Sequence, residues 1–131
     1  MPEENLPHGM LPGSLELAYL GDALYDLAVR EALVRRGGKV RDLHRAAVER
    51  VCAHAQAEAL SRVMDRLTEE EQAVVRRARN AHQSPPKNAD RAEYHRATGL
   101  EALIGYLYIM GREARMREIL DAATGDIDEG R

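Results

Sequence analysis

Two acidic side chains stand out because apolar residues surround them in the sequence. Asp22 lies in the run 17–23, and Glu101 lies in the run 99–105. An acid inside a core-facing run is costly to bury unless it is paired or binds a cation. Arginine could pair with each acid; alternatively, two acids on separate helices could hold Mg²⁺, which needs only one or two protein carboxylates. Such an ion can activate water for phosphodiester hydrolysis.

The residue before the first acid is a glycine, which is unusual inside a helix. Gly21 costs roughly 0.5–1 kcal/mol relative to alanine at such a position. It therefore predicts the close approach of another backbone or of a ligand. Asp26 follows Asp22 by one turn, so the two acids share a helix face.

The basic residues are concentrated in one segment. The chain has 19 basic and 22 acidic residues, a net charge of −3, whereas the segment 76–96 carries +4. Its loop, 81–90, contains two prolines and can present several cations to a polyanion. Arginine binds phosphate oxygens in a bidentate fork, and the asparagines of the segment add uncharged donors. A merely solvated charged face is the alternative interpretation.

The elements that must position these residues are predicted to be helices. The 131 residues include no Phe and no Trp, and Ala, Arg and Glu are abundant, which favours an all-α fold. Apolar spacing and capping signals predict helices over 15–36, 40–67 with a break near 51–54, 69–80, 91–110 and 113–123. The first helix is expected to bury Leu17, Leu20, Leu24 and Leu27. One domain, 14–123, is expected between an N-terminal arm, 1–13, and a polar tail, 124–131.

Composition excludes several other classes of protein. The longest apolar run is far below the ~20 residues of a membrane helix, and the acidic start is no signal peptide. A single cysteine, Cys52, excludes a disulfide framework and is expected to be a buried thiol in the cytoplasm. Glu69, Glu70 and Glu71 could suggest a nucleotide hydrolase, but capping with Thr68 explains this run better.

Both acidic runs resemble motifs of the ribonuclease III family. The run Leu-Ala-Tyr-Leu-Gly-Asp-Ala ending at Ala23 resembles the family's signature, Glu-x-x-Glu-Phe-Leu-Gly-Asp-Ala. The run Thr-Gly-Leu-Glu-Ala-Leu-Ile-Gly ending at Gly105 resembles its second motif, Asp-x-x-Glu-Ala-Leu-Ile-Gly. The family's two upstream glutamates fall on Leu15 and Ala18, and its aspartate before the second glutamate falls on Thr98. With Ala18 and Thr98 in place of acids, only two of the usual four metal-site carboxylates remain. This pattern is similar to the Mini-ribonuclease III branch, which lacks a double-stranded-RNA-binding domain.

The resemblance implies a homodimeric, Mg²⁺-dependent hydrolase of the cytoplasm in which Mn²⁺ can substitute. This endonuclease would cleave double-stranded RNA and trim 23S ribosomal RNA precursor during ribosome biogenesis, leaving 5′-phosphate and 3′-hydroxyl ends. Whether a ribosomal protein must first shape the RNA is left open. A non-catalytic RNA-binding scaffold of the same fold is the alternative, motivated by Ala18 and Thr98 in place of acids.

The resemblance also assigns roles to individual residues. Asp22 and Glu101 would be the catalytic and metal-binding residues, with Thr98, Asp26 and Asp90 as possible support. Tyr19, Leu20 and Gly21 are expected at the dimer interface. The predicted RNA-binding residues are Arg77, Arg79, Asn80, Lys87, Asn88 and Arg96.

Overall fold

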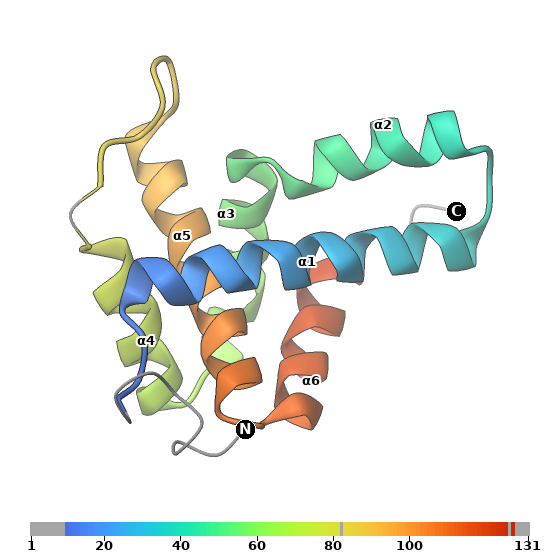
Figure 1. Cartoon of the computed structure of the whole chain (residues 1–131). Helices are drawn as coiled ribbons and strands as arrows, with labels where there is room; N and C mark the ends of the chain where they lie inside the picture. The colour runs from blue at the N-terminus through green and yellow to red at the C-terminus, as the bar shows by residue number, and fades with distance from the viewer. Residues whose placement is uncertain (1–9, 82, 126, 128–131) are drawn as a thin grey trace.

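The computed structural model describes residues 10–81, 83–125 and 127, and in this part of the chain every regular element is a helix. The all-α prediction is therefore confirmed. The elements in chain order are α1 (Ser14–Arg36), α2 (Val40–Val51), α3 (Ala53–Val63), the 3₁₀ turn η3 (Met64–Arg66), α4 (Glu69–Arg79), α5 (Arg91–Ile109) and α6 (Glu113–Thr124). Figure 1 shows α1 crossing α5, with α4 and α6 on either side of that crossing and α2 returning above α1.

Helix boundaries follow the local signals in the sequence. Thr68 accepts a hydrogen bond from the backbone N–H of Glu71, and the Glu71 carboxylate accepts one from the backbone N–H of Thr68, which confirms the predicted capping box. Asp90 caps α5 in the predicted way by accepting from the N–H of Glu93. The expected break near 51–54 occurs at Cys52, whose extended backbone separates α2 from α3. This junction leaves Cys52 exposed, so the prediction of a buried thiol is wrong.

The crossing of α1 and α5 is a contact between two backbones. A Cβ atom added to Gly21 would lie 1.7 Å from the carbonyl oxygen of Glu101. Conversely, a Cβ added to Gly105 would lie 2.0 Å from the carbonyl oxygen of Leu17. Each helix thus offers a glycine to the other, and side chains at either position would force the helices apart. The close approach predicted from Gly21 is confirmed.

This contact also sets the rotation of α1 about its own axis. Gly21 must face α5, and the positions that share its face are Leu17, Tyr25 and Ala28, all of which are buried. The sequence pattern had placed Leu27 on the buried face, and that prediction is wrong because Leu27 is 64% exposed. Leu20 and Leu24 lie between these extremes and are partly buried.

Glu71 links α4 to α6 in addition to its capping role. Its side chain is buried and accepts two hydrogen bonds from Arg115, at 2.9 Å from Nε and 2.8 Å from Nη2. These bonds hold the pKa of Glu71 below its usual value. Glu71 therefore has a structural role, which agrees with the interpretation of the acidic run 69–71 as part of a helix cap.

The C-terminal end differs from the expected polar tail. Ile127 belongs to the hydrophobic core, and its carbonyl oxygen accepts a hydrogen bond from Arg36 at 3.3 Å. Most of the expected arm, residues 1–9, and residues 126 and 128–131 of the expected tail lie outside the described residues. No described helix combines the length and the apolar character that crossing a membrane requires.

The glycine contacts predict a large stability loss from a single methyl group. Gly21→Ala and Gly105→Ala should each lower the free energy of unfolding by at least about 2–3 kcal/mol, because overpacking here opposes backbone and no flexible side chain can yield. Urea denaturation followed by circular dichroism measures this. Gly13→Ala is the control, since its Cβ would meet the flexible Glu16 carboxylate at 3.3 Å. Equal stability of the Gly21→Ala variant and the wild type would contradict the backbone contact.

Candidate active site

The glycine contact brings the two acids of the sequence motifs together. Asp22 follows Gly21 on α1, and Glu101 is the residue of α5 whose backbone lies against Gly21. The Asp22 and Glu101 side chains line the same hollow, and the Asp22 carboxylate is near enough to raise the pKa of Glu101. Residues 79 positions apart in the sequence therefore form one acidic pair, as the two motifs predicted.

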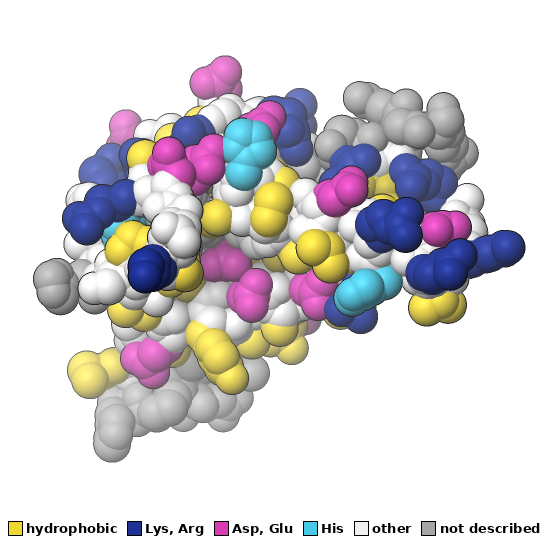
Figure 2. All heavy atoms as spheres, turned by 90° about the horizontal axis from the view of Figure 1, so that it is seen from above, with side chains coloured by type: hydrophobic (Ala, Val, Ile, Leu, Met, Phe, Trp, Pro, Cys, Tyr) yellow, Lys and Arg dark blue, Asp and Glu magenta, His cyan; other side chains and the backbone are white. Residues whose placement is uncertain are grey.

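The pair lies in a hollow of about 390 Å³ between three helices. α1 contributes Leu15, Ala18 and Asp22, and α5 contributes Thr98 and Glu101. Gln56 lines the hollow from α3, and Gln83 lines it from the loop before α5. Figure 2 shows this face of the molecule from above, with acidic side chains near its middle and basic side chains toward both ends. Asp22 is exposed at this hollow, whereas Glu101 is partly buried.

Burial and like charge act together on Glu101. Desolvation is the larger cause and the neighbouring Asp22 carboxylate is the second, and together they raise the pKa of Glu101 to about 8. A hydrogen bond from Gln56 acts in the opposite direction. Without a bound cation, Glu101 is therefore mostly protonated at neutral pH. Ionising both carboxylates in one hollow costs free energy because their charges repel. Such a pair is suited to binding a positive ion in place of the proton.

Gln56 is the residue of this hollow that sequence reasoning missed. Its side chain is 1% exposed, and its Nε2 donates to the Val51 carbonyl oxygen at 3.0 Å and to Glu101 Oε2 at 3.2 Å. A signal was available, because Gln56 precedes the buried Leu60 and Val63 by four and seven residues in an alanine-rich helix. A polar residue at such a core position needs partners, and here one partner is the catalytic candidate Glu101.

The residues expected to support the acids lie in different places. Thr98 lines the hollow but is buried, and its hydroxyl donates to the Tyr94 carbonyl oxygen at 3.0 Å. Asp26 is engaged by Arg30 at 3.3 Å, and Asp90 is the N-cap of α5. Thr98 alone of these three is therefore among the residues that line the hollow.

The predicted RNA-binding residues surround the hollow unevenly. Arg77 and Asn80 line a second, more open hollow of about 680 Å³, which shares Leu15 with the acidic one. Lys87 and Asn88 are exposed on the loop that Figure 1 shows projecting beside the start of α5.

Two further predicted RNA-binding residues lie on helices. Arg79 is exposed near the end of α4, and its side chain runs alongside Gly99 of α5. Arg96 instead ties α5 to α3, because its guanidinium donates to the Ala57 carbonyl oxygen at 3.0 Å and to the Ser61 hydroxyl.

The three residues expected at a dimer interface differ in their exposure. Tyr19 is 86% exposed and Leu20 is partly exposed, so both offer surface to another molecule. Gly21 is buried against α5 of the same chain. Its role in the described structure is therefore to bring the two helices together.

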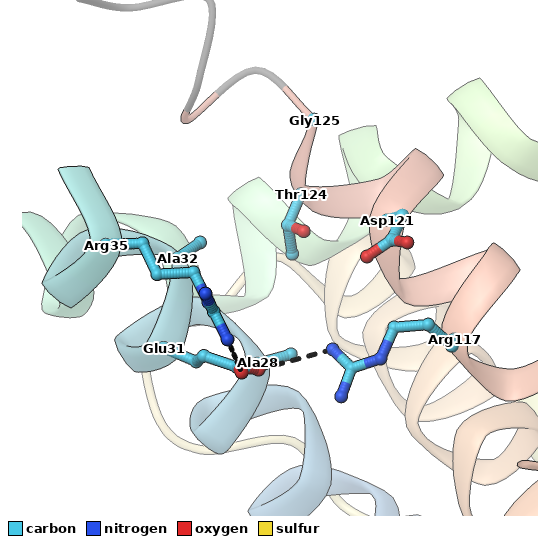
Figure 3. Close-up of a pocket in the computed structure, with 8 residues that line it drawn as sticks. All are labelled: Ala28, Glu31, Ala32, Arg35, Arg117, Asp121, Thr124 and Gly125. Atoms are coloured by element: carbon cyan, nitrogen blue, oxygen red, sulfur yellow. Dashed lines mark hydrogen bonds and ion pairs between the residues drawn. The ribbon is translucent and has the colours of Figure 1, made fainter.

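A different hollow, between α1 and α6, is lined by a cluster of opposite charges that has a structural role. Figure 3 shows Arg35 and Arg117 pointing toward Glu31 from two helices. Glu31 accepts from Arg35 at 3.1 Å and from Arg117 at 3.3 Å. These opposite charges attract one another, and the bond from Arg117 connects α6 to α1. The acidic pair of Asp22 and Glu101 differs, because both of its charges have the same sign.

Comparison with known proteins agrees with this geometry. The family model described as "Ribonuclease III domain" matches residues 15–112. A Mini-ribonuclease 3 of Symbiobacterium thermophilum is 55% identical over 118 residues, covering 88% of this chain and 91% of that protein. A Mini-ribonuclease 3 of Brevibacillus brevis is 50% identical over 120 residues, covering 90% of each chain.

A solved structure is similar as well. The crystal structure of a Fusobacterium nucleatum protein superposes with a TM-score of 0.76 at 31% identity, covering 83% of this chain and 88% of that one. The family match includes both acidic residues of the hollow and the whole of the basic loop. The chain therefore belongs to the ribonuclease III family and is an endoribonuclease of the kind that cleaves double-stranded RNA.

Proposed function

We propose that Asp22 and Glu101 hold a divalent cation, Mg²⁺ in the cell, and that this site hydrolyses phosphodiester bonds of double-stranded RNA. The observation that carries the proposal is the pairing of two carboxylates across α1 and α5 in an open hollow. The residues fit the ion, because Mg²⁺ binds through one or two carboxylates and completes its sphere with water and substrate phosphate. Mn²⁺ favours the same oxygen ligands and should substitute.

Three residues of the hollow have a role in this proposal. A bound divalent cation supplies charge stabilisation to the reacting phosphate and activates water for its hydrolysis. Asp22, which is exposed, would hold the ion from α1, and the ionised carboxylate of Glu101 would hold it from α5. Gln56 orients Glu101 through its hydrogen bond to Oε2.

The RNA is bound by the basic residues next to the hollow. Arg77 and Asn80 line the adjoining hollow, and Lys87 and Asn88 extend the surface along the loop. Cations placed in this way bind phosphates and position a duplex without reading its bases. We propose the ends of the 23S ribosomal RNA precursor as the natural substrate. Assays on that RNA with and without a ribosomal protein bound to it would show whether such a protein is required.

The active form is proposed to be a homodimer that uses the exposed side of α1. Tyr19, Leu27 and Val34 are all more than half exposed on this helix, although they are apolar or aromatic. A second copy would bury such a surface symmetrically. Because Asp22 also lies on α1, a dimer built there would carry two acidic hollows, one for each RNA strand.

Loss of the first carboxylate should abolish cleavage without loss of RNA binding. Asp22→Asn preserves shape but removes one of two charges that hold the ion, so the rate should fall by roughly a thousandfold or more at fixed Mg²⁺. Gel assays with perfect duplex RNA in Mg²⁺ and in EDTA measure cleavage, and filter binding measures affinity. Asp26→Asn, one turn away and paired with Arg30, is the matched control and should retain activity. Cleavage by Asp22→Asn would refute the assignment, and duplex binding with no metal-dependent cleavage by the wild type would favour a scaffold.

The raised pKa of Glu101 predicts a pH-dependent stability difference. Its carboxyl is protonated in the folded, cation-free protein up to a pKa of about 8 but ionises near 4.5 when unfolded. Folding stability is therefore progressively lost as the pH rises from about 4.5 to about 8. Glu101→Gln stays neutral, so in EDTA it should match the wild type at pH 4.5 and become more stable than the wild type by pH 8.

Urea midpoints across this pH range measure the effect. Mg²⁺ should stabilise the wild type and leave Glu101→Gln largely unchanged, because a ligand that binds the folded state raises its stability. Glu113→Gln removes an exposed carboxylate on α6 and is the matched control. A constant difference between Glu101→Gln and the wild type at all pH values would contradict the burial of this charge.

The basic residues should determine the salt dependence of RNA binding. Replacing Arg77, Arg79 and Lys87 by alanine should lower the log–log slope of affinity against salt by about 2–3, since each phosphate contact contributes a little less than one. The matched control removes Arg66, Arg112 and Arg117, three exposed cations that line neither the acidic hollow nor the adjoining one. An equal change of slope in both variants would show that only total charge matters.

A further inference from the structure

Gln56 carries a buried oxygen that has no partner, beside the acidic pair. Its Nε2 is fully used by the Val51 carbonyl oxygen and by Glu101 Oε2. Its Oε1 is buried and accepts no hydrogen bond from any described residue. Buried amide oxygens nearly always have a partner, so an isolated one indicates a partner that is not a protein group.

The orientation of this amide follows from its neighbours. Both groups that Nε2 contacts are oxygens that can accept hydrogen bonds. Turning the amide over would bring Oε1 against the Val51 carbonyl oxygen, which can only accept a hydrogen bond, and would remove the N–H that this oxygen accepts from. Oε1 is therefore the free group, and it belongs to a residue that lines the acidic hollow.

The cation site is short of protein oxygens. In the part of the chain that the structure describes, no group of three or more His, Cys, Asp or Glu side chains gathers as a metal site. Ala18 and Thr98 line the same hollow but add no charge, and the Thr98 hydroxyl already donates to Tyr94. Divalent cations accept side-chain amide oxygens as well as carboxylates. Two amide residues line the hollow, Gln56 and Gln83. Gln83 is exposed, whereas Gln56 Oε1 is buried and without a partner among the described residues.

We infer that Gln56 is a third oxygen donor of the divalent-cation site, binding the ion through Oε1 while Nε2 holds Glu101 in place. This inference rests on the proposed function of the acidic pair. A neutral amide can contribute an oxygen to the ion without adding a third negative charge next to Asp22 and Glu101. The side chain is held by its bond to the Val51 carbonyl at the end of α2, so its position does not depend on the ion.

Cation affinity of the intact protein tests this inference. Mn²⁺ is titrated into metal-free protein, and the free ion is followed by electron paramagnetic resonance. Gln56→Met, which keeps the volume but has no amide, should weaken Mn²⁺ binding about 10- to 100-fold. Gln56→Glu restores an oxygen and should bind Mn²⁺ at least as tightly as the wild type.

The chain offers a closely matched control. Gln72 on α4 also donates from Nε2 to the carbonyl oxygen five residues earlier, that of Leu67, at 3.3 Å. Gln72→Met therefore reproduces the loss of such a bond far from the hollow and should bind Mn²⁺ as the wild type does. Thermal unfolding in EDTA shows that each variant is folded. If Gln56→Met does not fold, Gln56→Glu decides: weaker Mn²⁺ binding than the wild type would overturn the inference.

The outcomes separate this inference from the proposed function. Mn²⁺ binding that Asp22→Asn abolishes but Gln56→Met leaves unchanged would overturn the role of Gln56 alone. Equal Mn²⁺ binding by the wild type and Asp22→Asn would contradict the proposed cation site, and the role of Gln56 would fall with it. Weakened binding in Gln56→Met with normal binding in Gln72→Met supports the inference.

Discussion

The structure depends above all on the backbone contact between α1 and α5. Gly21 and Gly105 remove the side chains that would keep the two helices at an ordinary separation, and each helix then packs directly on the carbonyl of the other. The residues next to this contact, Asp22 on one helix and Glu101 on the other, meet as a result. The acidic pair is thus a product of the crossing, and α4 and α6 pack around that crossing.

The charge balance of the hollow follows from which neighbours are ionised. Ala18 and Thr98 lie in its wall without charge, so its lining holds two carboxylates and the amides of Gln56 and Gln83. With no cation present, burial and mutual repulsion favour one proton on Glu101. In the proposed site an ion would therefore compete with this proton, and with few acids more of its coordination would come from the substrate phosphate. Substrate and ion binding are expected to strengthen one another.

Much of this organisation could be predicted from the sequence because the signals are local. The capping box at Thr68, the cap at Asp90, the break at Cys52 and the two acidic motifs each lie within a few residues. The rotation of α1 could not be predicted in this way, because apolar spacing alone placed Leu27 inside, and only the contact of Gly21 with α5 decides the buried face.

The remaining differences concern partners that are distant in the sequence. Gln56 reaches Glu101, 45 residues away, and Arg96 reaches Ala57, 39 residues away. Ile127 enters the core at the far end of the chain. A single sequence shows that such side chains are polar, charged or apolar. Their partners depend on how the helices pack, which spacing does not reveal.

The glycine contact also has a consequence for the size of ion that the protein can use. The carboxylates of Asp22 and Glu101 extend from two backbones that are already in contact, so the helices cannot move closer together. They also cannot separate easily without losing the packing of α1 on α5. Mg²⁺ binds oxygen at about 2.0–2.1 Å, whereas Ca²⁺ needs about 2.3–2.6 Å and more ligands. The fixed separation of α1 and α5 would therefore favour the smaller ion in the proposed site. This selectivity would depend on Gly21 and Gly105, two residues without a side chain.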